Sequence, residues 1–348
     1  MHRGALFEHI IGSCLITSNS MHILIASKTQ IPVVTYGGTE RVIWDLGRVL
    51  VELGHKVTYL VNAGSSCDFA PVIHINDQFD LRQQIPKDID IAHFHFLPDF
   101  DLDREFEHPY VYTEHGNSVD RPQLPLNAVF LSQNHAERHG SAQYVYNGLD
   151  WRTYGAVNFE QQRTYVHFLG KAAWRVKNVA GAIDVALKSG RKMSVLGGYR
   201  LNIKRGFRLT LSPKIRFHGM VGGETKFSLL NGSSALIFPV RWHEPFGLAV
   251  IESLYFGCAV FGTPYGALPE IVPDDCGTLA TSTHALAQAL MTKSVDQRAC
   301  HARAVDFFNV QKMCGGYLTK YEAVSSGEKL NRNSPRLGSG FKGLPWDD

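Results

Sequence analysis

The sequence shows no large excess of charge of either sign. Lys and Arg number 35 against 32 Asp and Glu, which leaves a formal charge of +3. A charge this small does not require nucleic acid or an anionic membrane as a partner. Hydrophobic residues make up 44% of the chain, yet no apolar run approaches the roughly 18 residues of a membrane helix. The composition therefore excludes a disordered, collagenous or membrane-spanning chain.

Cysteine is also scarce, and its positions follow no pattern. There is no Cys-x-x-Cys pair and no Cys/His cluster, which argues against a disulfide framework and against a zinc site. The cysteines are Cys14, Cys67, Cys258, Cys276, Cys300 and Cys314. This usage favours reduced thiols, so we expect a cytoplasmic protein with at most a peripheral contact at the cytoplasmic face of a membrane.

The first twenty residues need separate treatment. Arg3 and the apolar run 10–16 resemble parts of a signal peptide, but Glu8 and His9 interrupt the pattern and no clear cleavage site follows. We interpret residues 1–20 as an extension, expected to be disordered, and place the start of the folded chain at Met21.

Short apolar runs alternate with helical patterns over the rest of the chain. At 348 residues the chain is longer than one core usually organises, so two domains of roughly 150 residues are expected. The alternation predicts parallel sheets with helices on both faces. The clearest helix covers 39–53 and is followed by Gly54. The predicted strands are 22–26, 57–61, 90–94, 110–113, 128–131, 143–146, 164–169, 192–196, 215–217, 235–238 and 258–261.

A polar, strandless stretch over 151–163 separates two series of strands and helices. This stretch marks the boundary between the two expected domains. A segment that is apolar on several faces comes after them and needs more than one surface to bury it. The predicted units are a first domain over 21–155, a second over 160–303, a helix over 304–323 and a disordered tail over 325–348.

The strongest motif runs from His243 to Glu252. Glu244 follows a predicted strand, and a helix is expected to open near Gly247. The N–H groups of Phe246, Gly247 and Leu248 would then be free to bind an anion. Both carboxylates can face one ligand and accept hydrogen bonds from the hydroxyls of a sugar and a ribose. The alternative is a helix-start carboxylate and a solvated helix residue.

This stretch, Glu-x7-Glu with an internal Phe-Gly-Leu, resembles the signature of the retaining, nucleotide-sugar-dependent glycosyltransferases of family 4 (glycosyl transferases group 1). The resemblance covers about residues 21–325. It implies the GT-B fold, an α/β architecture of two Rossmann-like, doubly wound parallel-sheet domains facing a central cleft. In the family the first Glu contacts the donor sugar and the second the nucleotide ribose, which assigns these roles to Glu244 and Glu252. The family's last helix crosses back to the first domain, which matches 304–323.

A second segment carries basic residues on a strand-to-helix loop that begins at Gly170. Such a loop can neutralise a diphosphate leaving group. The family pattern is Gly-Arg with a Lys a few residues on. Here Lys171 stands where Arg is usual, and Lys177 comes one residue later than the common spacing, so Arg175 is an alternative for the second role. A solvated basic loop is the alternative.

Other residues are assigned by the same resemblance. Gly37 and Gly38 precede a predicted helix, where a glycine pair can cradle an anion; the family's loop borders the donor phosphates, and a plain turn is the alternative. His115 lies in a Thr-x-His-Gly motif whose His contacts the donor sugar in the family, although a lone His is more often structural. Gly197 belongs to a loop that lies near the nucleotide base.

The resemblance implies an enzyme that moves a sugar from a nucleotide-diphosphate sugar to a hydroxyl of a carbohydrate, lipid-linked or other acceptor, with retention. Polysaccharide, lipopolysaccharide or glycoconjugate synthesis would be its setting. No cofactor and no metal are expected, because the lysines supply positive charge and no Asp-x-Asp motif near a strand end is placed to hold an ion. The alternatives are a nucleotide-sugar 2-epimerase of the same fold and a non-catalytic sugar-nucleotide-binding protein. A nicotinamide oxidoreductase is disfavoured because no Gly-x-Gly-x-x-Gly follows the first strand.

One basic stretch has no place in this scheme. It contains Arg200, Lys204, Arg205, Arg208, Lys214 and Arg216, with no acidic residue between them. A solvated loop is the simplest interpretation, and contact with an anionic acceptor or a membrane surface is the alternative. Phe207 is the one aromatic residue interleaved with these charges, so no nucleic-acid partner is expected.

Overall fold

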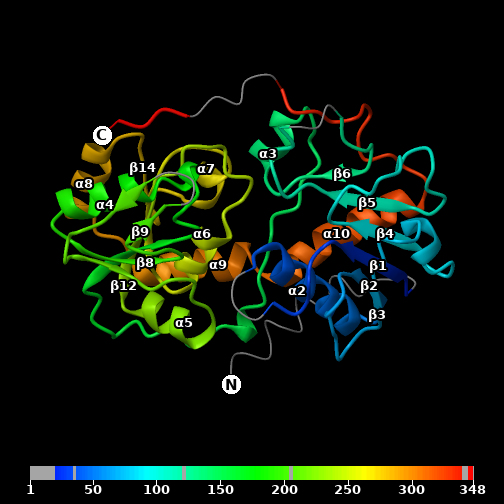
Figure 1. Cartoon of the computed structure of the whole chain (residues 1–348), viewed down its shortest axis with the longest axis horizontal. Helices are drawn as coiled ribbons and strands as arrows, with labels where there is room; N and C mark the ends of the chain where they lie inside the picture. The colour runs from blue at the N-terminus through cyan, green and yellow to red at the C-terminus, as the bar shows by residue number, and fades with distance from the viewer. Residues whose placement is uncertain (1–19, 34–36, 120–122, 204–206, 339–343, 348) are drawn as a thin grey trace.

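Two lobes, each built on one sheet, lie side by side in the computed structural model (Figure 1). The structure describes residues 20–33, 37–119, 123–203, 207–338 and 344–347. The extension expected over 1–20 lies outside the described residues except for Ser20. The polar stretch that we interpreted as a boundary lies between the last strand of the first sheet and the first strand of the second.

The first sheet has six strands in the order β3-β2-β1-β4-β5-β6, and every neighbouring pair is parallel. Its central strand β1 is buried along its whole length, as a strand covered on both faces must be. The strands are β1 (His22–Ser27), β2 (Lys56–Val61), β3 (Val72–His74), β4 (Ile91–Phe94), β5 (Tyr110–Thr113) and β6 (Ala128–Val129). The helical elements of this half are α2 (Thr39–Glu52), η1 (Leu81–Gln84), α3 (Gln133–Arg138) and η2 (Trp151–Thr153).

The second sheet also has six parallel strands, in the order β11-β8-β7-β12-β13-β14. They are β7 (Tyr165–Leu169), β8 (Lys192–Leu196), β11 (Ile215–Phe217), β12 (Ser233–Phe238), β13 (Ala259–Gly262) and β14 (Gly277–Leu279). A separate antiparallel ribbon, β9 (Leu201–Asn202) and β10 (Arg208–Leu209), lies between β8 and β11 in the chain. The helical elements are η3 (Arg175–Lys177), α4 (Val179–Lys188), α5 (Gly223–Asn231), α6 (Leu248–Tyr255), α7 (Leu268–Ile271), α8 (Thr283–Thr292) and α9 (Gln297–Phe307).

The predicted doubly wound α/β class is confirmed by these two parallel sheets. The prediction of a strand over 143–146 is wrong, because only an isolated bridge between Phe130 and Tyr144 forms there. The three-residue strands β3 and β14 were missed, whereas β11, of the same length, was predicted, because so short a run gives only a weak periodic signal.

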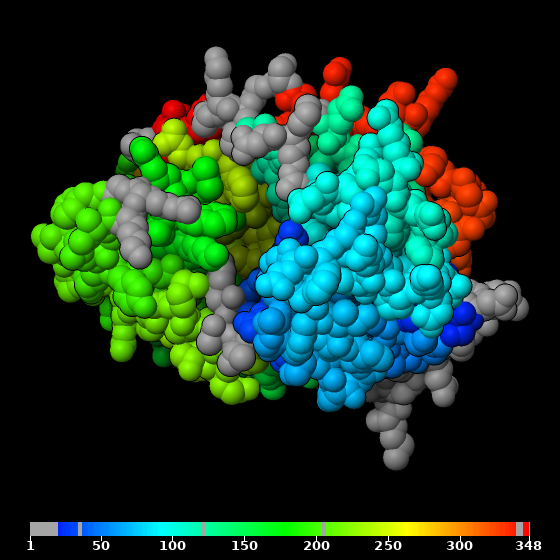
Figure 2. Space-filling view, turned by 45° about the vertical axis from the view of Figure 1, so that its right-hand side comes forward, coloured from blue at the N-terminus to red at the C-terminus, as the bar shows by residue number. Residues whose placement is uncertain are grey.

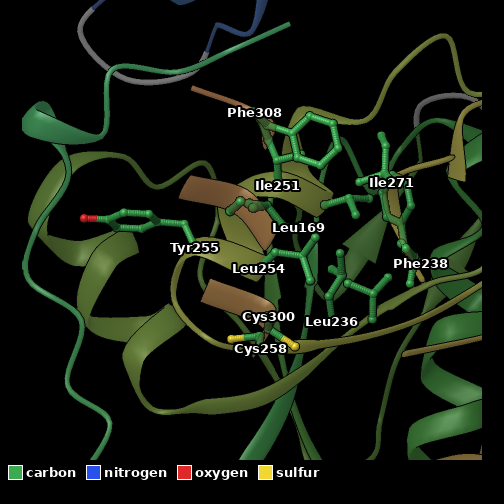
Figure 3. Packing of buried hydrophobic residues seen from close by; sticks show 14 of the residues in the cluster. Leu169, Leu236, Phe238, Ile251, Leu254, Tyr255, Cys258, Ile271, Cys300 and Phe308 are labelled. Carbon is green, nitrogen blue, oxygen red and sulfur yellow. The ribbon is translucent and has the colours of Figure 1, made fainter. Parts of the chain in front are cut away.

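The core of the second domain packs α6 and α9 against its sheet (Figure 3). Leu236 and Phe238 of β12 lie in one buried cluster with Ile251 and Leu254 of α6, and Cys300 of α9 belongs to the same cluster. Because α6 buries these side chains, its N-terminus is held at the carboxyl end of the sheet, where ligands bind in doubly wound folds.

The chain leaves the second domain at a break between two helices. The single helix expected over 304–323 is wrong, because α9 ends at Phe307 and α10 (Val310–Ser325) starts a new helix capped by the side chain of Asn309. The helix α10 buries Tyr317 and Tyr321 in the core of the first domain, beside α2. Figure 1 shows α9 and α10 in orange, one in each lobe.

The tail was expected to be disordered over 325–348, but its described part up to residue 338 is hydrogen-bonded to the first domain. Asn331 is buried, and its N–H donates to the carbonyl of Leu126 over 3.0 Å. The N–H of Leu124 donates to the carbonyl of Pro335 over 2.8 Å. These bonds order the segment although its composition is polar.

The last described residues, 344–347, lie back on the second domain (Figure 1). The N–H of Asp347 donates to the carbonyl of Thr281, and the carbonyl of Asp347 accepts from Thr283 N–H. Residues 339–343 and 348 of the expected tail lie outside the described part of the chain.

Two further expectations concern cysteine and membranes. Cys67, Cys258, Cys276, Cys300 and Cys314 are free thiols, and Cys14 lies outside the described residues. No helix within the described ranges has the length and apolar character needed to cross a bilayer.

Candidate active site

A cleft of about 360 Å³ lies between the domains and takes its lining from both. Figure 2 shows the hollow between the blue and cyan first lobe and the green second lobe. The cleft brings together most of the site residues predicted from the sequence, namely Gly37, Gly38, His115, Gly170, Lys171, Lys177, Glu244, Phe246, Gly247 and Leu248. Glu252 lines a smaller cavity of about 70 Å³ that shares Gly37, Gly38 and Leu248 with the cleft.

Two predicted residues do not line either cavity. Arg175 is exposed on η3, whereas Lys177, two residues later, reaches the cleft. Gly197 has φ of +120° and lies so close to the carbonyl of Gly170 that a Cβ would collide with it. The structure therefore gives Gly197 a supporting position behind the Gly170 loop.

The N-terminus of α6 is shaped by Gly247, whose φ of +109° is a conformation that other residues rarely adopt. The preceding backbone is fixed by Gly266, because the carbonyl of Glu244 accepts a 2.9 Å hydrogen bond from Ala267 N–H beside a Glu244–Gly266 bridge. The first N–H groups of a helix have no intrahelical partner. In α6 these groups lie at the cleft, which favours an anion there.

The N-terminus of α2 meets the same point from the first domain. Gly38 is its N-cap, and a Cβ on Gly38 would lie 2.9 Å from Cδ1 of Leu248. Glycine at this position therefore lets two helix N-termini from different domains approach one another across the cleft.

Glu244 is paired and oriented by two neighbours. Its Oε2 accepts hydrogen bonds from Lys177 Nζ over 2.6 Å and from Trp242 Nε1 over 2.7 Å. Nζ of Lys177 also lies 4.8 Å from the ring centroid of Trp242. Oε1 of Glu244 has no hydrogen-bond partner among the described residues, so it is available to a ligand hydroxyl.

Glu252 is buried in a cluster of three donors that all reach Oε1. Arg41 Nη1 and the hydroxyl of Tyr154 each donate over 2.6 Å, and Lys226 Nζ donates over 2.5 Å. Burial by itself raises the pKa of Glu252, but the charges of Lys226 and Arg41 outweigh it and lower the pKa to about 2. The carboxylate is therefore ionised at neutral pH although it is buried.

This cluster joins both domains beside the cleft. Arg41 comes from α2, Tyr154 from the linker and Lys226 from α5, and Trp242 supports Glu244 in the same region. The sequence analysis missed all four as site residues. Arg41 could have been found, because it lies three positions after Gly38 in the first turn of the predicted helix. The other three carry no local pattern, because they meet their carboxylates only in the folded chain.

His115 follows β5 and projects into the cleft region. Its Nε2 lies 2.8 Å from Nδ1 of His95. Burial lowers the pKa of His115 to about 4, so the ring is neutral at pH 7. A neutral imidazole can exchange one hydrogen bond with a sugar hydroxyl through its second nitrogen. In the described ranges of the chain, no group of three or more His, Cys, Asp and Glu side chains could hold a metal ion.

Comparison with known proteins points to one family. The family model described as Glycosyl transferases group 1 matches residues 163–293, from the start of the second sheet to the end of α8. This range contains Lys171, Lys177, Glu244 and Glu252. A comparison with curated proteins found no match.

Solved structures share the fold of this chain. The glycosyltransferase AviGT4, involved in avilamycin A biosynthesis, superposes with a TM-score of 0.71 at 19% identity, over 88% of this chain and 98% of that one. Sucrose-phosphate synthase from Thermosynechococcus elongatus gives 0.70 at 15% identity, over 88% and 100%. Anabaena HepE in complex with UDP-glucose gives 0.65 at 16% identity, over 88% and 100%. The GT-B arrangement predicted from the sequence is confirmed by these matches.

Proposed function

We propose that the chain is a group 1 glycosyltransferase, because that family's model matches residues 163–293, and that it transfers a sugar from a nucleotide-diphosphate sugar to an acceptor hydroxyl with retention of configuration. The observation that carries the proposal is the cleft itself. It places two lysines, the N-terminus of α6 and the Glu244 carboxylate around one volume, and a buried ionised Glu252 lies in the adjoining cavity.

The diphosphate of the donor would lie between the N-termini of α6 and α2. Their N–H groups, with Lys171 and Lys177, supply the positive charge that stabilises the departing diphosphate. Lys177 is paired with Glu244, but an ammonium has three N–H donors, so it can bond the carboxylate and phosphate oxygens together.

The two carboxylates would bind different parts of the donor. Glu244, with Oε1 available, accepts from hydroxyls of the transferred sugar. Glu252 is held through Oε1 by three donors, which leaves Oε2 for a ribose hydroxyl. Neutral His115 completes the sugar site from the first domain.

In this arrangement catalysis rests on positioning and on leaving-group stabilisation. The bond between the anomeric carbon and the diphosphate oxygen breaks, and the acceptor oxygen bonds to that carbon from the same face. The acceptor proton passes to a diphosphate oxygen, so no protein base is consumed. This scheme needs no metal ion, because the lysines and helix termini supply the charge.

The site indicates the chemical class of the donor and of the acceptor. HepE was solved with UDP-glucose, which makes UDP-glucose the first donor to test. The acceptor is a carbohydrate, lipid-linked or other hydroxyl compound, in polysaccharide, lipopolysaccharide or glycoconjugate synthesis, and no nucleic acid takes part.

A thermal-shift screen of nucleoside diphosphates tests the proposal. A ligand at 100 times its Kd adds about 2.7 kcal/mol to the free energy of unfolding, which raises the melting temperature measurably. With the best donor, product analysis should show the free nucleoside diphosphate and a glycoside that keeps the donor's anomeric configuration. An epimerised sugar without transfer, or no thermal shift with any nucleotide, would overturn the proposal.

Metal independence is tested with the same assay. Transfer should continue in EDTA at the rate seen without it. Activity that disappears with EDTA and returns with manganese contradicts the lysine-based scheme while leaving donor binding intact.

A further inference from the structure

The ribbon between β8 and the edge strand β11 carries its apolar side chains toward solvent. We call the described residues 199–203 and 207–211 the apolar ribbon. Six of its side chains are large, apolar and strongly exposed, with exposed fractions from 49% to 81%: Tyr199, Leu201, Ile203, Phe207, Leu209 and Leu211. The basic stretch that the sequence analysis singled out runs through the same segment.

These six residues share one face. Side chains alternate along an extended chain, and the apolar residues occupy every second position in 199–203 and in 207–211, around the short strands β9 and β10. The antiparallel register sets Leu201 opposite Leu209 and Asn202 opposite Arg208. The ribbon is therefore amphipathic in its described part, with Leu201 and Leu209 paired on the apolar face.

The polar face of the ribbon is the one that packs on the domain. Arg200 donates to the carbonyls of Thr210 and Ile215 over 3.0 and 2.6 Å. Arg208 donates to Oγ1 of Thr210 over 3.1 Å and lies 5.0 Å from the ring centroid of Phe217. A register slip of one residue would exchange the two faces, and these bonds oppose it. The outward apolar face is thus part of the fold.

Such a face differs from ordinary surface apolar residues. Single exposed apolar side chains are common and need no explanation. Phe79, Val119 and Met291 are of this kind, on separate elements with exposed fractions of 61%, 57% and 55%. A contiguous apolar face on one ribbon instead marks an interaction surface.

The charge around the ribbon indicates its partner. Between Asp184 and Glu224 the sequence has no acidic residue, although the whole chain is nearly neutral. Exposed basic residues lie on the segments that come before and after the ribbon in the chain: Lys188, Arg191, Lys192, Lys214 and Arg216. A partner must therefore offer negative charge around an apolar interior.

We propose that the apolar ribbon docks on the surface of a bilayer that contains anionic lipids. The apolar side chains enter the boundary between headgroups and acyl chains, and the basic residues lie against the headgroups. Tyr199 and Phe207 suit this depth, where aromatic rings are favoured. Insertion is shallow, because the unpaired backbone groups at the edges of a two-stranded ribbon must stay hydrated. The inference stands apart from the proposed function.

Vesicle co-sedimentation of the full chain tests it. The protein should sediment with vesicles of equal parts phosphatidylcholine and phosphatidylglycerol and remain in solution with phosphatidylcholine alone. Raising the salt to about 0.5 M should weaken binding, because the headgroup attraction is screened. The triple variant Ile203→Ser/Phe207→Ser/Leu211→Ser should lose binding by about tenfold or more, since each inserted side chain contributes hydrophobic transfer energy.

A control replaces three exposed apolar residues elsewhere, Phe79→Ser/Val119→Ser/Met291→Ser, and should bind like the wild type. Both triple variants should keep the melting temperature of the wild type, since all six residues are exposed. Absence of wild-type binding to anionic vesicles overturns the proposal, as does an equal loss in both triple variants. A dimer in light scattering that the ribbon variant alone makes monomeric would also overturn it, by showing an interface between copies.

Discussion

At the scale of single residues, the two carboxylates Glu244 and Glu252, eight positions apart in the sequence, have different surroundings. At the cleft, Glu244 accepts hydrogen bonds from Lys177 and from the indole of Trp242. Glu252 is buried and accepts from Arg41, Lys226 and the hydroxyl of Tyr154. In the donor complex that we propose, Glu244 would bind the transferred sugar, and Glu252, which is held rigidly at the smaller cavity, would bind the nucleotide ribose. Substitution of each carboxylate should therefore affect a different part of donor binding, either the nucleotide or the sugar.

Glu252→Gln should weaken binding of the nucleoside diphosphate, and Glu244→Gln should not. Loss of a charge-assisted hydrogen bond costs about 1.5–3 kcal/mol, which calorimetry resolves. Glutamine keeps the shape of each side chain and avoids a cavity. Glu244→Gln should instead weaken the nucleotide sugar. Equal losses for both ligands in both variants would contradict this division of roles.

Lys226 should control the ionisation of Glu252. Lys226→Met removes the largest favourable charge, so the pKa of Glu252 rises from about 2. Nucleotide affinity relative to the wild type should then fall as the pH is lowered from 7.5 toward 5, because a protonated carboxyl is a weaker acceptor. Lys226→Arg keeps the charge and should restore the wild-type pH profile of Kd. Identical profiles for the Met and Arg variants would refute this.

At the scale of elements, both sheets carry a buried neutral histidine. His93 on β4 bonds the hydroxyls of Tyr321 and Thr113, and His167 on β7 bonds those of Ser233 and Ser253. Burial lowers the pKa of each to about 3. These histidines link α10 to the first sheet and α6 to the second, so their neutral state supports packing at both.

Stability should therefore fall as the pH drops from 7 to 5. In this window the unfolded chain binds protons at an ordinary histidine pKa near 6.5, and the folded chain does not, so unfolding is favoured by acid. The cost is on the order of 2 kcal/mol per histidine at pH 5. Urea denaturation at both pH values measures it.

His93 and His167 together account for a loss of unfolding free energy between pH 7 and pH 5. His167→Asn should remove about half of that loss, whereas the exposed control His284→Gln should leave the loss unchanged. A free energy of unfolding that stays flat between pH 7 and 5 in the wild type would show that these histidines are accessible to protons in the folded state.

At the scale of the whole molecule, the chain passes between the domains more than once. The linker leads from the first domain to the second, α10 returns to the first, and residues 344–347 lie on the second again. Arg241 Nε donates to the carbonyl of Leu344 over 3.2 Å. The hydroxyl of Tyr265 donates to the carbonyl of Pro345 over 2.7 Å. Arg241 directly precedes Trp242, so the tail supports the site.

Ending the chain after Gly338 should lower stability and weaken donor binding together. The lost hydrogen bonds contribute roughly 0.5–1.5 kcal/mol each, and the loop of Trp242 and Glu244 loses its outer support. Thermal melts and donor calorimetry measure the two effects. A control of the same length, with residues 344–347 replaced by Gly and Ser, should behave like the truncation. Unchanged melting and affinity would mean that the tail has no role in the site.

The sequence by itself determined what depends on neighbours along the chain. The strand and helix periods predicted both sheets and α2, and the strand ends located Gly37, His115, Lys171 and Glu244, which do line one cleft. Such features can be predicted because burial of one face and the opening of a helix are decided within about ten residues.

Only the tertiary structure decided the rest. The donors on Glu252 come from residues up to 211 positions away, the choice of Lys177 over Arg175 depends on which side chain of η3 faces the cleft, and the outward face of the ribbon depends on how Arg200 is bonded. The tail is ordered by carbonyl and N–H groups of both domains. In each case the deciding contact joins segments whose separation in the chain is too large for any local pattern to record.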